Sequence, residues 1–206
     1  MRRGLAAGLV CAVVVLVAGC TGNDPDMPGL TASPTATPTP TPTPTPSPTS
    51  IAGTVVDLSD PELGIVFEDV PDLSGDEADV YNWISTFQVE YWRTLTTNQV
   101  SPAFDIVASS EEKARMEGLA ERNAAGGLVI AGTFHVTVDD VSLTGESARA
   151  VVCHDYRDVT LVGPEGPRTL ADEGIDVPRL FEFTLAPSPL IANTWTVVVG
   201  EVIGTC

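Results

Sequence analysis

Residues 74–95, SGDEADVYNWISTFQVEYWRTL, decide the class of fold, because their apolar side chains recur at helical spacing. Four of them follow at intervals of three or four residues: Ile84, Phe87, Tyr91 and Leu95. Ser74 and Glu77 have the S-x-x-E spacing of a capping box, which starts a helix. We therefore predict a helix of about twenty residues whose apolar stripe is widened by Trp83 and Trp92 and faces the core.

Two shorter helices are predicted after it. Ser101 and Pro102 offer an N-cap and a first helical position for a short helix that continues to Val107. Ser109 and Glu112 repeat the capping-box spacing and start a third helix. Gly126 and Gly127 provide its C-terminal stop.

Beyond Gly127 the apolar pattern changes from helical to alternating. Apolar and polar residues alternate over 134–139 and again over 148–153, with Gly145 between them, which predicts a hairpin. Residues 163–178 are rich in Gly, Pro and acids and predict a long loop. Strands at 180–185 and 195–202 follow. Helices followed by antiparallel strands indicate an α+β domain, with the helices packed on one face of a curved sheet.

The start of the chain predicts export and lipidation. A basic start at Arg2-Arg3 precedes an apolar stretch, Leu5 to Ala18, which is shorter than the roughly 20 residues that cross a bilayer. The run Leu16-Val17-Ala18-Gly19-Cys20 resembles the lipobox of bacterial lipoproteins. The resemblance implies a signal peptide at 1–19 and an acylated (palmitate-bearing) Cys20 at the extracytoplasmic face of the plasma membrane. An ordinary secretory signal is the alternative.

Residues 20–53 form the second segment, between the lipid and the domain at 54–206. Between Thr31 and Ser50 the chain is almost wholly Pro, Thr, Ser and Ala, so it cannot build a core. Alternating proline favours polyproline II, and some 20 residues would span roughly 60 Å. We expect a disordered stalk, acting as a spacer or a plain linker.

The charge of the chain excludes one class of partner. The formal net charge is −18, and removal of Arg2 and Arg3 from the 10 basic residues leaves 8 against 28 acidic residues, or −20. Such a chain repels nucleic acid and anionic lipid head groups. The charge leaves basic or cationic partners possible. The acidic residues are also what keeps an exported protein soluble and monomeric.

The cysteines predict one disulfide bond. Cys11 leaves with the signal peptide and lipid modifies Cys20, so Cys153 and Cys206 are left to pair in an oxidising compartment. A metal site or a catalytic thiol is the alternative reading of this pair.

No cofactor or metal is predicted. Asp57, Asp60 and Glu62 form one acidic cluster, and a second lies between Asp72 and Asp79. Neither has the order of an EF-hand, and acids at a helix start favour the helix dipole. The motifs G-x-S-x-G, H-E-x-x-H, Cys-x-x-Cys and the Walker loop do not occur.

The domain nevertheless resembles a known family. Tyr91-Trp92, the segment Val152-Cys153-His154-Asp155 and the terminal segment 195–206 resemble the NTF2-like (SnoaL-like) lipoproteins of high-GC Gram-positive bacteria. The resemblance covers roughly residues 76–206. It implies a sheet curled into a cone whose mouth holds an apolar ligand or docks another domain.

Enzymatic relatives, such as ketosteroid isomerases, polyketide cyclases and scytalone dehydratase, use an Asp or His inside the cone as a general acid or base. The resemblance therefore makes His135, His154 and Asp155 the catalytic candidates, with Tyr156 beside them. His135 and His154 lie on strands expected to be neighbours and so could converge. The alternation, however, directs His135 away from Phe134 and Val136, and Asp155 suggests that the strand frays.

The sequence thus favours a binding module over an enzyme. The expected partner is an envelope protein, a cell-wall component or an apolar small molecule. A small-molecule isomerase or dehydratase that uses the cone is the alternative, and a purely structural accessory domain is the third possibility.

Overall fold

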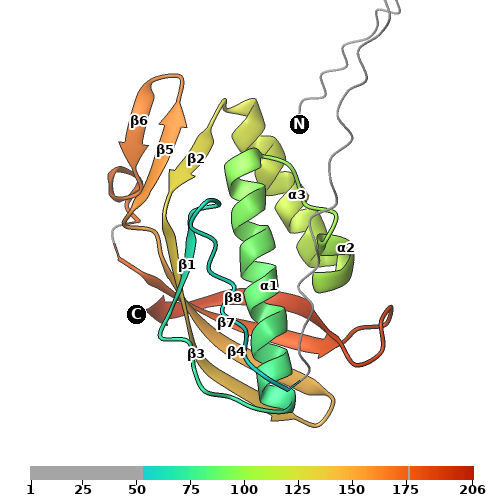
Figure 1. Ribbon diagram of the computed structural model, residues 1–206. Coiled ribbons are helices and arrows are strands. Elements are labelled where there is room, and N and C mark those ends of the chain that lie inside the picture. The colour runs from blue at the N-terminus through green and yellow to red at the C-terminus, as the bar shows by residue number, and fades with distance from the viewer. Residues whose placement is uncertain (1–52, 176) are drawn as a thin grey trace, which may run out of the picture. The chain divides into compact units, whose positions relative to one another are not determined.

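Three helices and two sheets build the domain, which the computed structural model describes over residues 53–175 and 177–206 (Figure 1). The predicted signal peptide, the lipidated Cys20 and the Pro/Thr stalk lie outside these residues. The α+β prediction is confirmed, since the helices pack on sheets that are mainly antiparallel. Within the described part of the chain, no helix is both long and apolar enough to cross a membrane.

The long aromatic helix is confirmed as α1, Asp76–Thr97, but its predicted capping box is wrong. Gly75 is the N-cap, with φ 64°, and no side chain caps the helix. The backbone of Ser74 instead pairs with Thr54, because the entering chain lies against the start of α1. Asp79 fixes that entry by accepting a hydrogen bond from the amide of Gly53 at 2.9 Å.

The two following helices are α2, Phe104–Val107, and α3, Ser110–Ala125. The predicted cap of α3 is confirmed, since the Ser109 hydroxyl accepts from the amide of Glu112 at 3.2 Å. The Gly126 stop is also confirmed. α2 begins later than predicted, with Ala103 as N-cap, because Ser101 and Pro102 form a turn in front of it.

The larger sheet has the strand order β1-β3-β4-β7-β8. Its strands are β1 Ile65–Glu68, β3 Phe134–Thr144, β4 Ser147–Asp155, β7 Arg179–Pro187 and β8 Trp195–Thr205. The predicted hairpin is β3–β4, and Gly145 turns the chain with φ 62°. β1, which the sequence analysis did not predict, pairs in parallel with β3.

A second sheet corrects the predicted loop. Its strands are β2 Val129–Gly132, β5 Val159–Gly163 and β6 Gly166–Thr169, in the order β2-β5-β6. The loop prediction over 163–178 is wrong in its first part, because Gly163 and Gly166 pair across a two-residue turn and start a hairpin. The 3-10 helix η1, Ala171–Glu173, follows.

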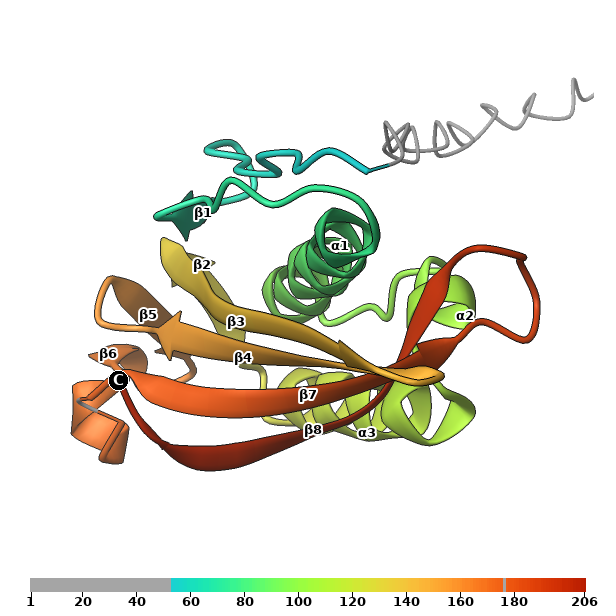
Figure 2. The same cartoon turned by 90° about the horizontal axis from the view of Figure 1, so that it is seen from below.

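The core lies between α1 and the larger sheet, which curves beneath the helix (Figure 2). Its largest fully buried side chains include Trp92, Tyr81, Phe87, Phe104, Phe134 and Ile84. The core assignment of Trp92 is confirmed: its indole nitrogen donates to the carbonyl of Leu63 at 3.0 Å. Trp83 is only half-buried and packs against the edge of the core. The sheet therefore has an inner face against α1 and an outer face away from it.

Candidate functional site

The register of β3 and β4 separates the predicted catalytic residues onto two faces of the sheet. His135 lies opposite Asp155, and Val136 lies opposite His154. Successive side chains of a strand point to opposite faces. His154 thus joins the buried inner face, whereas His135 and Asp155 belong to the outer face. The two histidines do not converge on one site.

His154 is enclosed by aromatic rings on the inner face and is only 2% exposed. Its ring centre lies 4.3 Å from that of Phe181 and 5.0 Å from that of Phe134. Nδ1 of His154 is 2.9 Å from the hydroxyl of Tyr156, which is 3.0 Å from the hydroxyl of Tyr91. The expectation that the strand frays here is wrong, because His154 also pairs with Arg179 of β7.

Burial controls the protonation of this inner cluster. Desolvation, followed by the charge of Arg115, lowers the pKa of His154 to about 3. Desolvation also raises the pKa of Tyr91 and holds that of Tyr156 well above its ordinary value. His154 and both tyrosines are therefore neutral near pH 7. General base catalysis favours a group with a pKa near the working pH, and His154 is far from that condition.

An open groove of about 760 Å³ lies on the outer face, at the end of the sheet where β1, β3 and β4 lie near Cys206, the residue after β8. It contains two of the three catalytic candidates and both cysteines of the predicted disulfide. Its walls are formed by Glu68, Asp69, His135, Thr137, Asp139, Cys153, Asp155, Arg157, Asp158, Pro178 and Cys206.

His135 bridges two elements across this groove. Its Nδ1 lies 2.8 Å from Oε1 of Glu68 in β1, and its Nε2 lies 3.2 Å from Oδ2 of Asp158, after β4. Asp155 pairs with Arg157, whose Nε is 2.9 Å from Oδ1. This side-chain hydrogen bond is the main cause of the lowered pKa of Asp155.

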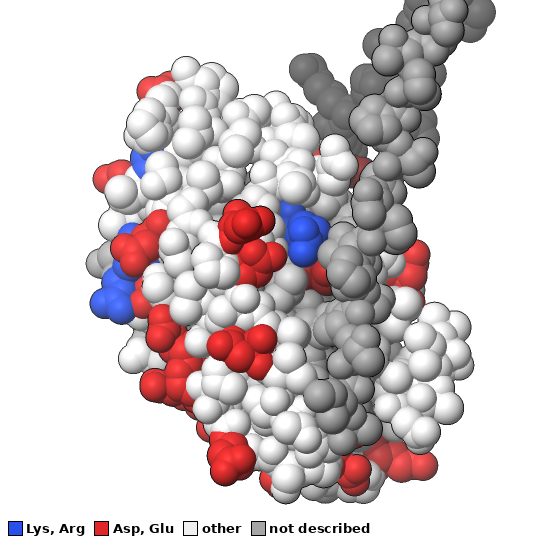
Figure 3. All heavy atoms as spheres, in the orientation of Figure 1, with Lys and Arg blue, Asp and Glu red and all other residues white. Residues whose placement is uncertain are grey.

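Negative charge dominates the groove. Five of its side chains are carboxylic acids, against the single guanidinium of Arg157 and the imidazole of His135. Desolvation, together with the nearby charge of Asp69, raises the pKa of Asp139. Acidic side chains also predominate across the face seen in Figure 3, where few basic side chains are visible. The groove is therefore suited to positively charged groups.

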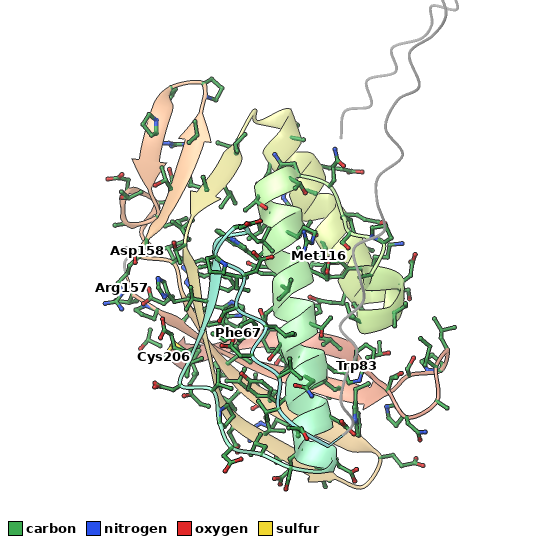
Figure 4. All side chains as sticks on the ribbon, in the orientation of Figure 1. Phe67, Trp83, Met116, Arg157, Asp158 and Cys206 are labelled. Carbon is green, nitrogen blue, oxygen red and sulfur yellow. A yellow bond between two sulfur atoms is a disulfide. The ribbon has the colours of Figure 1, made fainter. Side chains whose placement is uncertain are left out.

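The predicted disulfide partners meet at the groove wall. The structure joins Cys153 of β4 to Cys206, with Cα atoms 6.0 Å apart, and Figure 4 shows Cys206 along the same margin as Arg157 and Asp158. The link crosses β7 and fixes the end of β8. Oxidation of this pair in the protein itself stays a prediction.

Sequence analysis missed four acidic residues of the groove. Glu68, Asp69 and Asp158 were not singled out, because β1 and the turn after β4 were not recognised, and Asp139 was treated only as part of the alternating strand. The signal available was the acidic pair Asp139-Asp140 inside an alternating strand. Among the described residues, no three or more His, Cys, Asp or Glu side chains are grouped in a way that could hold a metal ion.

Comparisons with known proteins add little to this geometry. No protein-family model and no curated protein matches the chain. Among solved structures, the chain is similar to the intermembrane space region of chloroplast protein ARC6, with 15% sequence identity and a TM-score of 0.47. That match covers 65% of this chain and 99% of the ARC6 structure.

Proposed function

We propose that this chain is a lipoprotein held at the extracytoplasmic face of the plasma membrane through acylated Cys20. Its domain, residues 54–206, would be an NTF2-like binding module for a partner in the cell envelope. The order of elements, with α1 to α3 first and β3, β4, β7 and β8 afterwards, supports the NTF2-like assignment. So does the curvature of the sheet beneath α1 (Figure 2).

The burial and low basicity of His154 are the observation that favours a binding function over a catalytic one. His154 is the one catalytic candidate on the inner face. Aromatic rings enclose it, and its pKa is lowered to about 3. A neutral, enclosed imidazole of such low basicity is poorly suited to accept a proton from a substrate at neutral pH. His135 and Asp155 lie on the outer face, where Glu68 contacts His135 and Arg157 pairs with Asp155.

The groove on the outer face is the binding surface that we propose. Its excess of carboxylates favours a partner that presents Lys or Arg side chains, in agreement with the acidity of the whole chain. A stalk of the predicted length would lift this groove well clear of the lipid.

Site-specific crosslinking in intact cells tests the proposal. A photoreactive side chain at Thr137, in the groove, should capture one partner through a segment rich in Lys or Arg. Thr160 is the matched control, because it is also a half-buried strand threonine but lies on β5, outside the groove. Asp155→Asn together with Glu68→Gln should reduce capture at Thr137. Identical products from both positions, or undiminished capture in the double variant, would contradict the proposal.

A further inference from the structure

β8 forms one border of the larger sheet, and β7 is its only partner strand among the described residues (Figure 2). Near the start of β8 the other side of the strand is occupied, because the amide and the hydroxyl of Ser109 donate to the carbonyls of Val197 and Val198. Over residues 199–205 no described residue forms a backbone hydrogen bond to that side. Such a border presents a row of unpaired N–H and C=O groups on which a further strand can form.

This part of β8 is also apolar and exposed. The side chains of Val199, Val202 and Ile203 are 39%, 54% and 48% exposed. All three are β-branched, a side-chain type that favours strands. Residues 199–202 pair with β7 without a register shift, so the border is regular there. An exposed, regular border of this kind is a template for strand addition by another chain.

The two faces of β8 differ in chemistry at this border. Val202 lies opposite Phe181, which packs against the core, so Val202 belongs to the inner face. Glu201 lies opposite Glu182 on the outer face. Glu182 pairs with Arg149, whereas Glu201 has no ion-pair partner among the described residues. A strand beside β8 thus meets an apolar side chain on one face and an unpaired carboxylate on the other.

We propose that β8 binds an extended segment of the envelope partner, in which basic residues alternate with apolar ones, as an added strand. The side chains of a strand alternate between its faces, so the apolar residues lie beside Val202 and a Lys or Arg lies beside Glu201. The inference rests on the proposed binding function and names the form of the partner's segment. A second copy of the chain is disfavoured as the occupant, because each copy carries a large excess of acidic residues.

A synthetic peptide of about eight residues that alternates Lys and Val is the probe, since strands are usually of this length. Its binding to the full protein should protect amides within residues 199–205 from hydrogen exchange, because the added strand occupies them. A peptide of the same sequence with methylated backbone amides keeps the charges but cannot donate to β8. It should bind about ten-fold more weakly.

Glu201→Lys tests the border from the side of the protein. The substitution places a like charge beside a lysine of the peptide, so the affinity should fall about five-fold. Glu146→Lys is the matched control, because Glu146 is also exposed and the change in net charge is equal, but it lies in the turn between β3 and β4. Its affinity for the peptide should stay close to that of the wild type.

Asp155→Asn together with Glu68→Gln separates this inference from the groove. Protection of residues 199–205 that persists in this double variant supports the added strand independently of the groove. Binding that is lost in the double variant, with no protection of β8 in the wild type, would retain the groove and overturn the added strand. No binding of the peptide, or equal binding of its methylated form, would also overturn it. So would protection that appears without peptide and rises with protein concentration, because that indicates a second copy.

Discussion

His154 shows at the scale of one residue how the fold changes what a side chain can do. In the sequence it is the most suggestive candidate for acid–base chemistry, next to Asp155 and Tyr156. In the structure its partners are a tyrosine hydroxyl and a shell of aromatic rings. Its charge is lost because desolvation of an imidazolium in this shell is unfavourable.

The lowered pKa of His154 predicts a pH dependence of stability. Between pH 6.5, the ordinary value, and about pH 3, the unfolded chain binds a proton at this site that the folded chain does not. The stability that comes from keeping His154 neutral is fully present above pH 6.5 and is lost as the pH falls toward 3. The free energy of unfolding should therefore fall by about 1.4 kcal/mol per pH unit on acidification from this residue alone.

Urea denaturation of His154→Phe between pH 4 and 7 measures this contribution. The free energy of unfolding of the wild type should fall more steeply with falling pH than that of the variant, because the variant has no imidazole to charge. His135→Gln, which keeps His154, should retain the steep fall. Equal pH dependence of the wild type and His154→Phe would show that His154 is not held neutral by burial.

The position of His154 is also a part of the site that was not predicted from the sequence. Alternation along β3 correctly directed His135 away from Phe134 and Val136, because a strand has a period of two. Along β4 the same alternation puts His154 on the face of Ala150 and Val152, but the strand was expected to fray at Asp155, so the position of His154 was missed. The carboxylates that face His135 come from β1 and from the turn after β4, both distant in sequence or unrecognised.

At the scale of elements, close packing between β7 and β8 depends on glycine. Gly200 lies opposite Phe183, and a Cβ at this position would lie 2.7 Å from Cδ1 of the Phe183 ring. That ring cannot readily move, because it packs against Phe87 and His154. Gly204, on the same strand, has no heavy atom within 4 Å of such a Cβ.

We predict that Gly200→Ala lowers the free energy of unfolding by about 1–3 kcal/mol through overpacking. Gly204→Ala is the matched control and should change it by less than about 0.5 kcal/mol. Chemical denaturation of the two variants side by side measures both values. Equal stability of Gly200→Ala and Gly204→Ala would mean that the Phe183 ring can move to make room for the added methyl group.

Two serines show why helix limits are only partly readable from sequence. Ser74 and Ser109 both precede a glutamate by three residues, yet only Ser109 caps its helix. The difference is tertiary, because the chain around Gly53 and Thr54 lies against the start of α1 and displaces the local motif. Likewise Gly163 and Pro164 suggested a loop, whereas a two-residue turn there starts β6.

At the scale of the whole molecule, the Cys153–Cys206 link connects the last strand to the middle of the sheet. It closes a loop with a sequence separation of 53, so the chain-entropy model gives a stabilisation of about 4 kcal/mol. Replacement of both cysteines by serine should lower the free energy of unfolding by about that amount. Reductant should then destabilise the wild type and leave the double variant unchanged; the same response in both would rule out the bond.

The central claim is that a lipid on Cys20 holds an oxidised domain outside the cytoplasm. The intact mass of the protein extracted from membranes tests it most directly. We predict a chain that begins at Cys20, carries the added mass of its acyl groups, and gains the mass of two hydrogens on reduction of the disulfide. A mass that includes residues 1–19, or that lacks any acyl addition, would contradict the claim.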